Sequence, residues 1–498
     1  MELFRFDFSV LFTFSNMFAI VIGTLSGLLI GALPGMGATI GIALMLPITY
    51  TMNPLTSILL LVSVYQAAEY GGSISSIVLG VPGTPAAVAT ILDGAPMARK
   101  GYPGKALGYS LTGSTIGGIF GAIVLMTLTI PLASIALNFS DPELTLIGIL
   151  GLLCIASLGS TDIPKSLVAI ALGLLLSMIG LDGFIGRPRF TFGITGLLDG
   201  LLMIALLVGM FAFSEVMSML GGDLGKRFVT NTKNLKTNLT LKEFKYISVT
   251  AVKGSIIGSV VGILPGLGAG PASWISYAEA RRSSNNPEDF GKGEPKGIAA
   301  TESANNGAVG GALVPLLTLG IPGSPATAVI LGAFLIQGIQ PGPAVFQEDP
   351  NLIYGIFWGF LIAAICMYFI GRYTTSLCAS LLVIPVYALI PIVLLATILG
   401  SYAGRYFIFD VWVAIIAGIV CFFLKKLDFS LPAFILAFIL GPMIEKSWRR
   451  SLMLSGGSYS IFVTRGYSVF VIGLIIILLV STILKSMKTR KKAGNKAA

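Results

Sequence analysis

Two stretches of this chain, more than two hundred residues apart, are near-copies of each other. Gly23 to Ala38 reads GTLSGLLIGALPGMGA and Gly254 to Ala269 reads GSIIGSVVGILPGLGA, with eight of the sixteen positions identical. A second pair follows, GVPGTPA from Gly80 and GIPGSPA from Gly320. All four are apolar segments broken by Pro and Gly. Matching interrupted segments in the two halves of a membrane chain are typical of the binding site of a secondary transporter.

The composition places the chain in a membrane. Of its 498 residues 55% are hydrophobic and only 11% are charged, which is unlike a soluble globular protein. Many apolar stretches reach about 18 residues, the length of a membrane-crossing helix. Since every backbone polar group must be satisfied in hydrocarbon, these stretches predict helices. We expect an all-α polytopic membrane protein with roughly ten to fourteen membrane segments, some of them partial spans.

Several chemistries are excluded by absent residues. The chain has no histidine, which removes the commonest general base and metal ligand. It also has no GxxxxGK[ST] loop for ATP. The four cysteines lie singly in apolar stretches, which favours packing over chemistry. We therefore expect no enzyme activity and no cofactor, apart from a possible bound Na⁺.

The repeats and the charged stretches divide the chain into six parts. The predicted parts are a first repeat at 15–110, intervening transmembrane helices at 111–222, a basic cytoplasmic linker at 223–247, a second repeat at 248–343, C-terminal transmembrane helices at 344–484 and a disordered basic cytoplasmic tail at 485–498.

Positive charge falls on opposite flanks of the two repeats. The loop after LPGMGA has no charge, whereas its counterpart carries Arg281, Arg282, Lys292 and Lys296. After the PGTP element the bias reverses, because Arg99, Lys100 and Lys105 follow the first copy and Gln347, Glu348 and Asp349 follow the second. Since cytoplasmic loops collect Lys and Arg, this swap predicts repeats of inverted topology.

Glycines spaced four apart lead into each LPG break. Gly23 and Gly27, like Gly254 and Gly258, predict a helix face that a neighbouring backbone approaches closely. The prolines and glycines that follow predict the end of one half-helix and the start of another, whose free N–H groups favour an anion. A purely structural kink is the alternative. The candidate substrate-binding residues here are Gly35, Gly37, Ala38, Gly266, Gly268 and Ala269.

The PGTP and PGSP elements predict a second pair of breaks, because two prolines flank each Gly-Thr or Gly-Ser. Such unwound backbone lines a wet cavity or is packed in protein. The candidate substrate-binding residues here are Thr84, Pro85, Ser324 and Pro325, with Asn305 and Asn306 from a polar cluster. The candidate ligands of a coupling ion are Ser73, Ser75, Thr84, Glu302, Ser303, Ser324 and Thr327.

Two acidic residues precede these breaks, Glu69 and Glu302. A carboxylate costs about 2.5–3.5 kcal/mol at the centre of a membrane helix on insertion scales. Each is therefore a cation ligand, a proton carrier or a residue at the membrane boundary. Glu302 lies only six residues after Lys296, which suits the boundary interpretation.

The LPG[ML]GA repeats, the stretch YGGSISSIVLGVPGTPA and the stretch ESANNGAVGGALVPLLTLGIPGSPATAVILGAFLIQGIQPGP resemble the TctA family, the large membrane subunit of the tripartite tricarboxylate transporters. The resemblance covers essentially the whole chain. It implies binding elements at Pro34 to Ala38, Gly83 to Pro85, Pro265 to Ala269, Asn305, Asn306 and Gly323 to Pro325. The first copy departs from the second, since it has Gly71, Gly72, Ser73 and Ser75 where the second has its Asn-rich run.

The resemblance also implies a function. A subunit of this kind sits in the bacterial inner membrane and works with a small four-helix membrane subunit and a periplasmic solute-binding protein. It imports di- or tricarboxylates such as citrate by symport with Na⁺ or H⁺, with an elevator-type motion of its core.

Three other functions are consistent with fewer of these features. A uniporter, exchanger or channel for another small organic anion would use the same breaks. An integral-membrane transferase would need a nucleophile and base, for which the chain offers few residues. A scaffold that only docks partners is the third, and full transport in Asn305→Ala and Asn306→Ala variants would favour it.

Overall fold

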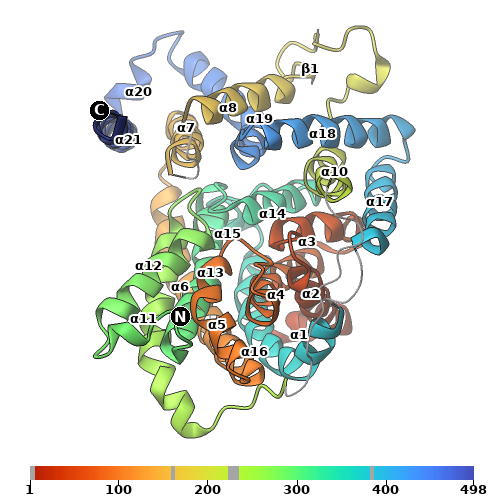
Figure 1. The fold of residues 1–498 in the computed structure, drawn as a ribbon. Coiled ribbons are helices and arrows are strands. Elements are labelled where there is room, and N and C mark those ends of the chain that lie inside the picture. Colours follow the sequence, from red (N-terminus) through yellow and green to blue (C-terminus); the bar gives the residue numbers. More distant parts are fainter. Residues whose placement is uncertain (1–5, 159–162, 222–234, 382–385, 498) are drawn as a thin grey trace. The chain divides into compact units, whose positions relative to one another are not determined.

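The computed structural model describes residues 6–158, 163–221, 235–381 and 386–497. These residues are helical apart from one antiparallel pair of two-residue strands, β1 (Gly180–Leu181) and β2 (Pro188–Arg189) (Figure 1). The prediction of a helical protein is confirmed. Three of the six basic residues of the predicted linker, Lys226, Arg227 and Lys233, lie outside the described residues.

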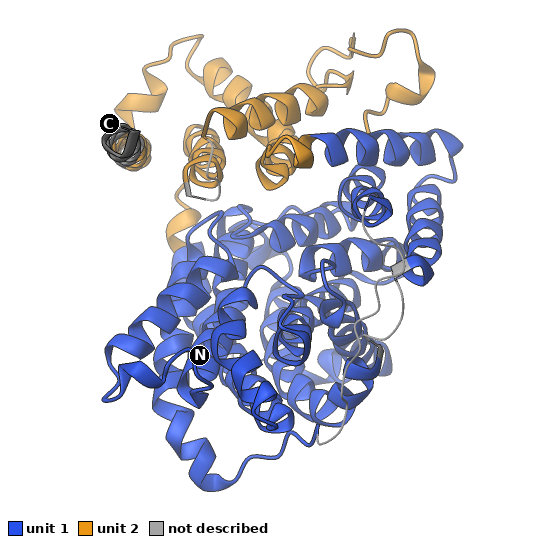
Figure 2. Ribbon diagram, in the orientation of Figure 1, with its two compact units in different colours: residues 1–133, 202–423 blue, residues 134–201, 424–498 orange. Residues whose placement is uncertain are grey.

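The chain forms two compact units, one from residues 1–133 and 202–423 and the other from residues 134–201 and 424–498 (Figure 2). The first unit holds most of the helices: α1 (Phe8–Leu11), α2 (Phe14–Ala32), α3 (Ala38–Met45), η2 (Leu46–Thr51), α4 (Pro54–Leu79), α5 (Val88–Arg99), α6 (Pro103–Ala136), α9 (Met203–Val208), η4 (Gly209–Phe213), α10 (Ser214–Leu220), α11 (Leu241–Ile263), α12 (Ala269–Arg282), η5 (Pro287–Asp289), α13 (Pro295–Leu319), α14 (Pro325–Ile336), α15 (Val345–Glu348), α16 (Pro350–Leu381), α17 (Val386–Ala403) and α18 (Ile408–Lys426).

The second unit is smaller. It contains α7 (Asp141–Leu158), α8 (Ile163–Ser177), β1, β2, η3 (Thr195–Leu197), α19 (Leu431–Leu454), α20 (Ile461–Thr464) and α21 (Gly466–Ala497). Helix α21 continues from its apolar part into the basic C-terminal residues. Lysine and arginine are good helix formers, and a helix that starts in an apolar stretch can extend into them.

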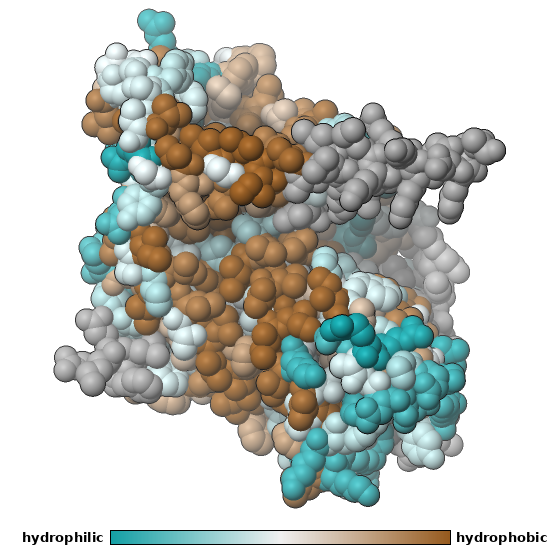
Figure 3. Space-filling model, turned by 90° about the vertical axis from the view of Figure 1, so that its left-hand side faces the viewer, coloured by the Kyte–Doolittle hydropathy of each residue, from teal (hydrophilic) through white to brown (hydrophobic). Residues whose placement is uncertain are grey.

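Seven of the described helices are long and apolar enough to cross a membrane: Phe14–Ala32, Pro103–Ala136, Met203–Leu220, Leu241–Ile263, Pro350–Ser380, Ile408–Lys426 and Leu431–Leu454. Shorter apolar helices accompany them, among them Ile163–Ser177 and Pro325–Ile336. Helix α11 exposes Val249, Val252, Ile256 and Val260, a stripe at helical spacing. Figure 3 shows hydrophobic side chains spread widely over the side on which α11 and α12 lie, with hydrophilic ones in separate patches. The protein is thus a multi-pass membrane protein.

The two sequence repeats fold into the same order of elements. In the first, α2 breaks at the LPG segment before α3, and α4 breaks at the PGTP segment before α5. In the second, α11, α12, α13 and α14 follow one another in the same way, with the breaks at LPG and PGSP. All four helix breaks therefore lie where the prolines and glycines predict them.

The glycine ladders are packing faces. A Cβ added at Gly27 would lie 2.6 Å from the Val64 carbonyl oxygen of α4. One added at Gly258 would lie 2.2 Å from the Ala304 carbonyl oxygen of α13. Helix α2 thus packs backbone to backbone on α4, and α11 packs likewise on α13. The packing role predicted for these glycines agrees with this geometry.

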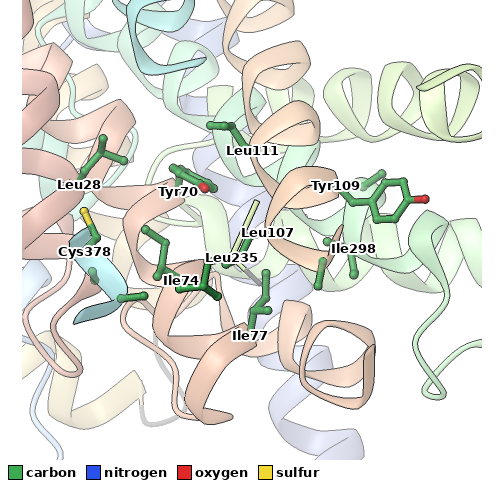
Figure 4. Close-up of a cluster of buried hydrophobic side chains, with 14 of the residues drawn as sticks. Leu28, Tyr70, Ile74, Ile77, Leu107, Tyr109, Leu111, Leu235, Ile298 and Cys378 are labelled. Atoms are coloured by element: carbon green, nitrogen blue, oxygen red, sulfur yellow. The ribbon is translucent and has the colours of Figure 1, made fainter. Parts of the chain in front are cut away.

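Helices α4 and α13 are buried along almost their whole length. Helix α2 covers α4, and α11 covers α13. In addition, α6, which follows the first repeat, covers α13 of the second repeat, and α16, which follows the second repeat, covers α4 of the first. Helix α6 meets α13 at Gly117, where an added Cβ would lie 2.3 Å from the Ser303 carbonyl oxygen. Helix α16 meets α4 at Gly359, beside Leu59. One hydrophobic cluster joins these helices, and Figure 4 shows Leu28, Tyr70, Leu107, Ile298 and Cys378 among its members.

The second break of each repeat packs against the other repeat. Helix α5 contacts α12 and α13, while α14 contacts α3 and α4. Hydrogen bonds also join each of these short helices to the other repeat. Asp93 of α5 binds the loop before α13, and Gln337 after α14 donates to the Thr49 carbonyl oxygen before α4 at 2.7 Å.

The second unit is fastened by ion pairs. Arg449 Nη1 lies 2.9 Å from Asp182 Oδ2, and Arg189 Nη1 lies 2.6 Å from Glu445 Oε1. The Arg449 guanidinium, together with the N–H groups of Phe184 and Ile185, holds the pKa of the Asp182 carboxyl well below its usual range. A carboxyl whose pKa falls on folding stabilises the protein above its unfolded pKa and stops doing so as the pH falls through the folded pKa.

We predict that Gly258→Ala destabilises the purified protein. The new methyl group has no room beside Ala304, and such overpacking typically costs about 1–3 kcal/mol. Gly473→Ala is the control, because a Cβ at Gly473 meets nothing within 4 Å. The thermal midpoint in detergent measures both. A Gly258→Ala protein as stable as the Gly473→Ala protein would contradict the close approach of α11 and α13.

We predict that acid weakens the second unit through Asp182. The stability it contributes is complete above about pH 4, the usual pKa of an unfolded aspartate, and declines below that value. Asp182→Asn should therefore flatten the fall in thermal midpoint between about pH 5 and pH 3. Asp289→Asn, at an exposed position, should leave the fall unchanged. Equal slopes for Asp182→Asn and the unchanged protein would rule out this contribution.

Candidate functional site

The LPG breaks place two uncapped helix N-termini in the first unit. Gly35 and Gly37 have φ values of 87° and 36°, and Gly266 and Gly268 have values of 84° and 62°. Side chains rarely adopt this left-handed region, so these turns depend on glycine. Helices α3 and α12 begin directly after Gly37 and Gly268, without a side-chain cap. Their first N–H groups are left for another acceptor, and the helix dipole favours an anion there.

The surroundings of these glycines differ. A Cβ added at Gly37 would meet nothing within 4 Å, so the start of α3 faces open space. A Cβ at Gly268 would lie 3.6 Å from Ser324 Cβ, which places the start of α12 beside the PGSP break. Ala38 and Ala269, the first residues of the two helices, are buried.

The PG[TS]P breaks begin at matching helix ends. Gly80 and Gly320 end α4 and α13 in the left-handed conformation, with φ values of 70° and 69°. The loop then folds back onto its own repeat. The Gly83 N–H donates to the Gly72 carbonyl at 3.1 Å, and the Gly266 N–H donates to the Gly323 carbonyl at 3.0 Å. The two breaks of the second repeat therefore touch each other.

Residues after these turns start the short helices. Ser324 and Thr327 form a capping box at the start of α14, where each side chain accepts from the other's N–H. Thr84 is buried, and its hydroxyl accepts from the Ala87 N–H at 3.3 Å. Pro85 is exposed, while Pro325 is half-buried.

The two repeats meet at these breaks. The hydroxyl groups of Tyr65 in α4 and Ser324 share a hydrogen bond of 2.9 Å, although they are 259 residues apart in sequence. Ala86, next to the PGTP turn, packs against Ala269, Ala272 and Ala304 of the second repeat. The structure thus brings Thr84, Pro85, Ala269 and Ser324, predicted separately, into one region.

Glu302 lies in a closed shell of hydroxyl groups. Its Oε1 atom accepts from Ser73 and Thr90, each at 2.5 Å, and its Oε2 atom accepts from Ser114 at 2.8 Å. These donors come from α4, α5 and α6, and the side chain has no exposed surface. Glu302 is thus enclosed by protein, and its interpretation as a residue at the membrane boundary stays a prediction. It lies two turns inside α13, where α6 covers it.

Asn305 and Asn306 join α13 to α4. The Asn305 amide nitrogen donates to the Glu69 carbonyl oxygen at 3.2 Å, and that of Asn306 donates to the Gln66 carbonyl oxygen at 3.0 Å. Both asparagines are buried, and Glu69 is 8% exposed. Both predicted asparagines therefore link α13 of the second repeat to α4 of the first.

The remaining candidate ion ligands are separated. Ser73 meets Glu302, and Ser324 meets Thr327. Ser75 donates to the Gly72 carbonyl within α4 at 3.1 Å. Ser303 donates to Ala300 within α13 and lies against Gly254 of α11. The structure therefore does not gather all seven candidates into one coordination shell.

Sequence reasoning missed several residues of this region. Tyr65, Gln66, Thr90 and Ser114 were not predicted, because hydroxyl and amide side chains in apolar helices carry no local signature. One signal was available: Gly113, Gly117 and Gly121 lie four apart in α6 and pack on α13. That spacing would have placed Ser114 beside the second repeat.

Asp93 is a further unpredicted contact. Its Oδ1 atom accepts from the N–H groups of Gly291, Gly293 and Glu294, each at 2.8 Å. Its Oδ2 atom accepts from the Tyr277 hydroxyl at 2.9 Å. The carboxylate therefore orders the loop that precedes α13 and fixes it to α5.

A groove of about 230 Å³ lies elsewhere in the first unit, between α11 and α12. Its lining includes Lys253, Lys296, Ser276 and Glu279, and contains none of the predicted site residues. Among the described residues no cluster of three or more acidic or cysteine side chains suits a multivalent metal ion.

Comparison with known proteins agrees with this architecture. Residues 17–436 match the family described as "Tripartite tricarboxylate transporter TctA family". A relative from Agrobacterium vitis, "Uncharacterized 52.8 kDa protein in TAR-I ttuC' 3'region", is 37% identical over 470 residues, which cover 94% of this chain and 93% of that protein. A second, "Uncharacterized protein in TAR-II ttuC' 3'region" from the same organism, is 36% identical over 234 residues, 47% of this chain and 97% of that protein. No solved structure matches the chain.

The protein is thus a multi-pass membrane protein of a transport family. The chain belongs to the TctA family of the tripartite tricarboxylate transporters, and it is a transporter component, not an enzyme. The resemblance seen in the sequence is confirmed.

We predict that Tyr65 and Ser324 are energetically coupled. In a double-mutant cycle with Tyr65→Phe and Ser324→Ala, the thermal stabilities should reveal a coupling of about 1 kcal/mol, the usual worth of one hydrogen bond. Tyr70→Phe is the matched control, because the Tyr70 hydroxyl binds Thr375 instead. Pairing Tyr70→Phe with Ser324→Ala should give additive effects. No coupling between Tyr65 and Ser324 would mean that the repeats do not meet there.

Proposed function

We propose that this chain is the large membrane subunit of a binding-protein-dependent carrier that imports di- or tricarboxylates by cation symport. Its partners are a small four-helix membrane subunit and a periplasmic solute-binding protein, in the bacterial inner membrane. The observation that carries the proposal is the meeting of the PGTP break of the first repeat with the PGSP break and the uncapped start of α12 of the second. Family membership supports the tricarboxylate-type substrate and the partners.

The helix breaks at the LPG and PG[TS]P segments would bind the substrate. A carboxylate would accept from the free N–H groups after Gly37 and Gly268, which supply partial positive charge without a basic side chain. Ser324, at the start of α14, lies beside Gly268 at the start of α12. Several polar groups on separate elements suit an anion with two or three carboxylate groups.

The exchange of contacts between the repeats supports inverted topology. Helix α5 packs on the second repeat and α14 packs on the first, as expected for halves related by an axis in the membrane plane. The reversal of basic flanks points the same way. We propose that this core moves as one body in an elevator-type cycle, with a coupling cation among its buried polar residues.

A uniporter, exchanger or channel is the second candidate, favoured by the open space at Gly37. A channel would conduct far faster than a carrier turns over. Uptake that survives collapse of both the Na⁺ and H⁺ gradients would favour a uniporter or exchanger.

The test is uptake of labelled citrate by proteoliposomes that hold the chain with its small membrane subunit, with the solute-binding protein added outside. We expect uptake to stop when both gradients are collapsed. Ser324→Ala should lower the initial rate about tenfold, because a hydrogen bond to a charged group contributes about 1.5 kcal/mol or more. Ser380→Ala, on the exposed end of α16, is the control. Equal rates for the two variants would remove Ser324 from the site.

A further inference from the structure

Unsatisfied polar atoms gather where α4 and α13 cross. Among the described residues, ten buried side-chain nitrogen or oxygen atoms have no hydrogen-bond partner, and five of them belong to Gln66, Glu69, Asn305 and Asn306. Four of these five are oxygens: Gln66 Oε1, Glu69 Oε2, Asn305 Oδ1 and Asn306 Oδ1. A buried polar atom without a partner costs about 1–3 kcal/mol. A bound ion or buried water would satisfy such a group of atoms.

The orientation of the asparagine amides follows from their contacts. Each amide nitrogen donates to a carbonyl of α4, that of Asn305 to Glu69 and that of Asn306 to Gln66. The amide oxygens are therefore the atoms left over. Gln66 and Glu69 lie one turn apart on α4 and so share the face that meets α13. The Asn305 amide thus lies beside Glu69 and the Asn306 amide beside Gln66, whose side chain also lies against Gly118 of α6.

The crossing also holds two buried carboxyl groups. Glu69 and Glu302 are both buried and interact electrostatically with each other. No ion pair among the described residues includes either of them. Glu302 is satisfied by three hydroxyl donors, whereas Glu69 keeps an oxygen without a donor. A buried carboxylate is stable only when a cation or proton balances its charge.

We propose that Gln66, Glu69, Asn305 and Asn306 bind a monovalent alkali cation, with Na⁺ as the ion. The Glu69 carboxylate supplies the charge and the three amide oxygens supply further ligands. A proton on Glu69 would add a single donor, whereas three amide oxygens, of Gln66, Asn305 and Asn306, have no partner. A divalent cation normally takes several carboxylates or keeps much of its water, and this crossing offers one available carboxylate. The ion's role as the coupling ion of transport rests on the proposed function.

The site links the ion to both repeats. Two ligands come from α4 of the first repeat and two from α13 of the second, so the bound ion would hold the halves together. The Thr84 side chain interacts with the Glu69 carboxyl, which connects the ion to the PGTP break. Ion binding would thus order one of the elements proposed to bind the carboxylate.

The test uses the purified full-length chain in detergent, without substrate or partner subunits. NaCl should raise the thermal midpoint relative to choline chloride at equal ionic strength, because a ligand of the folded state stabilises it. Glu69→Gln should abolish the Na⁺ effect, and Asn305→Ala should raise the Na⁺ dissociation constant about tenfold or more. Glu69→Asp, which keeps the charge, should retain part of the effect.

Glu279→Gln is the matched control, because it removes a carboxylate from α12 of the same unit without touching the crossing. It should keep the full Na⁺ response. If the Glu69 variants do not fold, hydrogen exchange of the unchanged protein tests the Na⁺ site instead. Na⁺ should then protect the amides around 66–69 and 305–306 relative to choline.

Three results would overturn the site. These are no stabilisation of the unchanged protein by any alkali cation, an undiminished Na⁺ response in folded Glu69→Gln, and Na⁺ protection confined to other segments. The outcome is separate from that of the transport proposal. Na⁺ binding at Glu69 without citrate uptake would support the ion site and contradict the proposed symport. Na⁺-driven citrate uptake, together with an unchanged Na⁺ stabilisation of Glu69→Gln, would support the symport and contradict the ion site.

Discussion

The structure depends on the close burial of α4 and α13. Their helix ends leave backbone N–H and carbonyl groups without helical partners, which hydrocarbon does not tolerate. Both helices are therefore shielded by others, α2 and α16 on α4, and α11 and α6 on α13. Glycine at the contacts makes this shielding dense enough to exclude lipid. Only behind such a shield can carboxylates and amides lie in the interior of a membrane protein.

The exchange of breaks between the repeats has a mechanical consequence. Asp93 ties α5 to the loop before α13, and Gln337 ties the end of α14 to the Thr49 carbonyl and the Ser57 hydroxyl before α4. Neither repeat can leave the other without breaking hydrogen bonds at both ties and at Tyr65. The core formed by the two repeats is thus better suited to move as one body than to open between its halves.

The sequence predicts the local features well, because proline and glycine act on their own neighbours. The four breaks, the packing ladders and the helical membrane class follow from such local rules. The contacts between distant residues do not. Nothing near Tyr65 indicates Ser324, and the donors to Glu302 come from three helices. The position of Glu302 six residues after Lys296 likewise gave no sign that α4, α5 and α6 enclose its carboxyl group. Asp93 carried no signal, since its backbone partners are invisible in a sequence.

The buried polar residues lie at different positions in the two repeats, although the helices and their breaks follow the same order. Both long helices end at a left-handed glycine, but Glu69 lies eleven residues before Gly80 and Glu302 lies eighteen before Gly320. The difference of seven residues is two helical turns. Measured from the glycine at the end of its own helix, each carboxylate therefore lies on the equivalent face, but Glu302 lies roughly 10 Å further from that end than Glu69 does. This offset lets Ser73 of the first repeat close the shell of Glu302, while Glu69 faces the asparagines of the second. The two repeats thereby place their carboxyl groups in different environments. Glu302 accepts hydrogen bonds from three hydroxyl groups, whereas Glu69 keeps an oxygen without a hydrogen-bond partner. Duplicated breaks with unequal polar partners favour a single ion site between the repeats over a pair of equivalent ones.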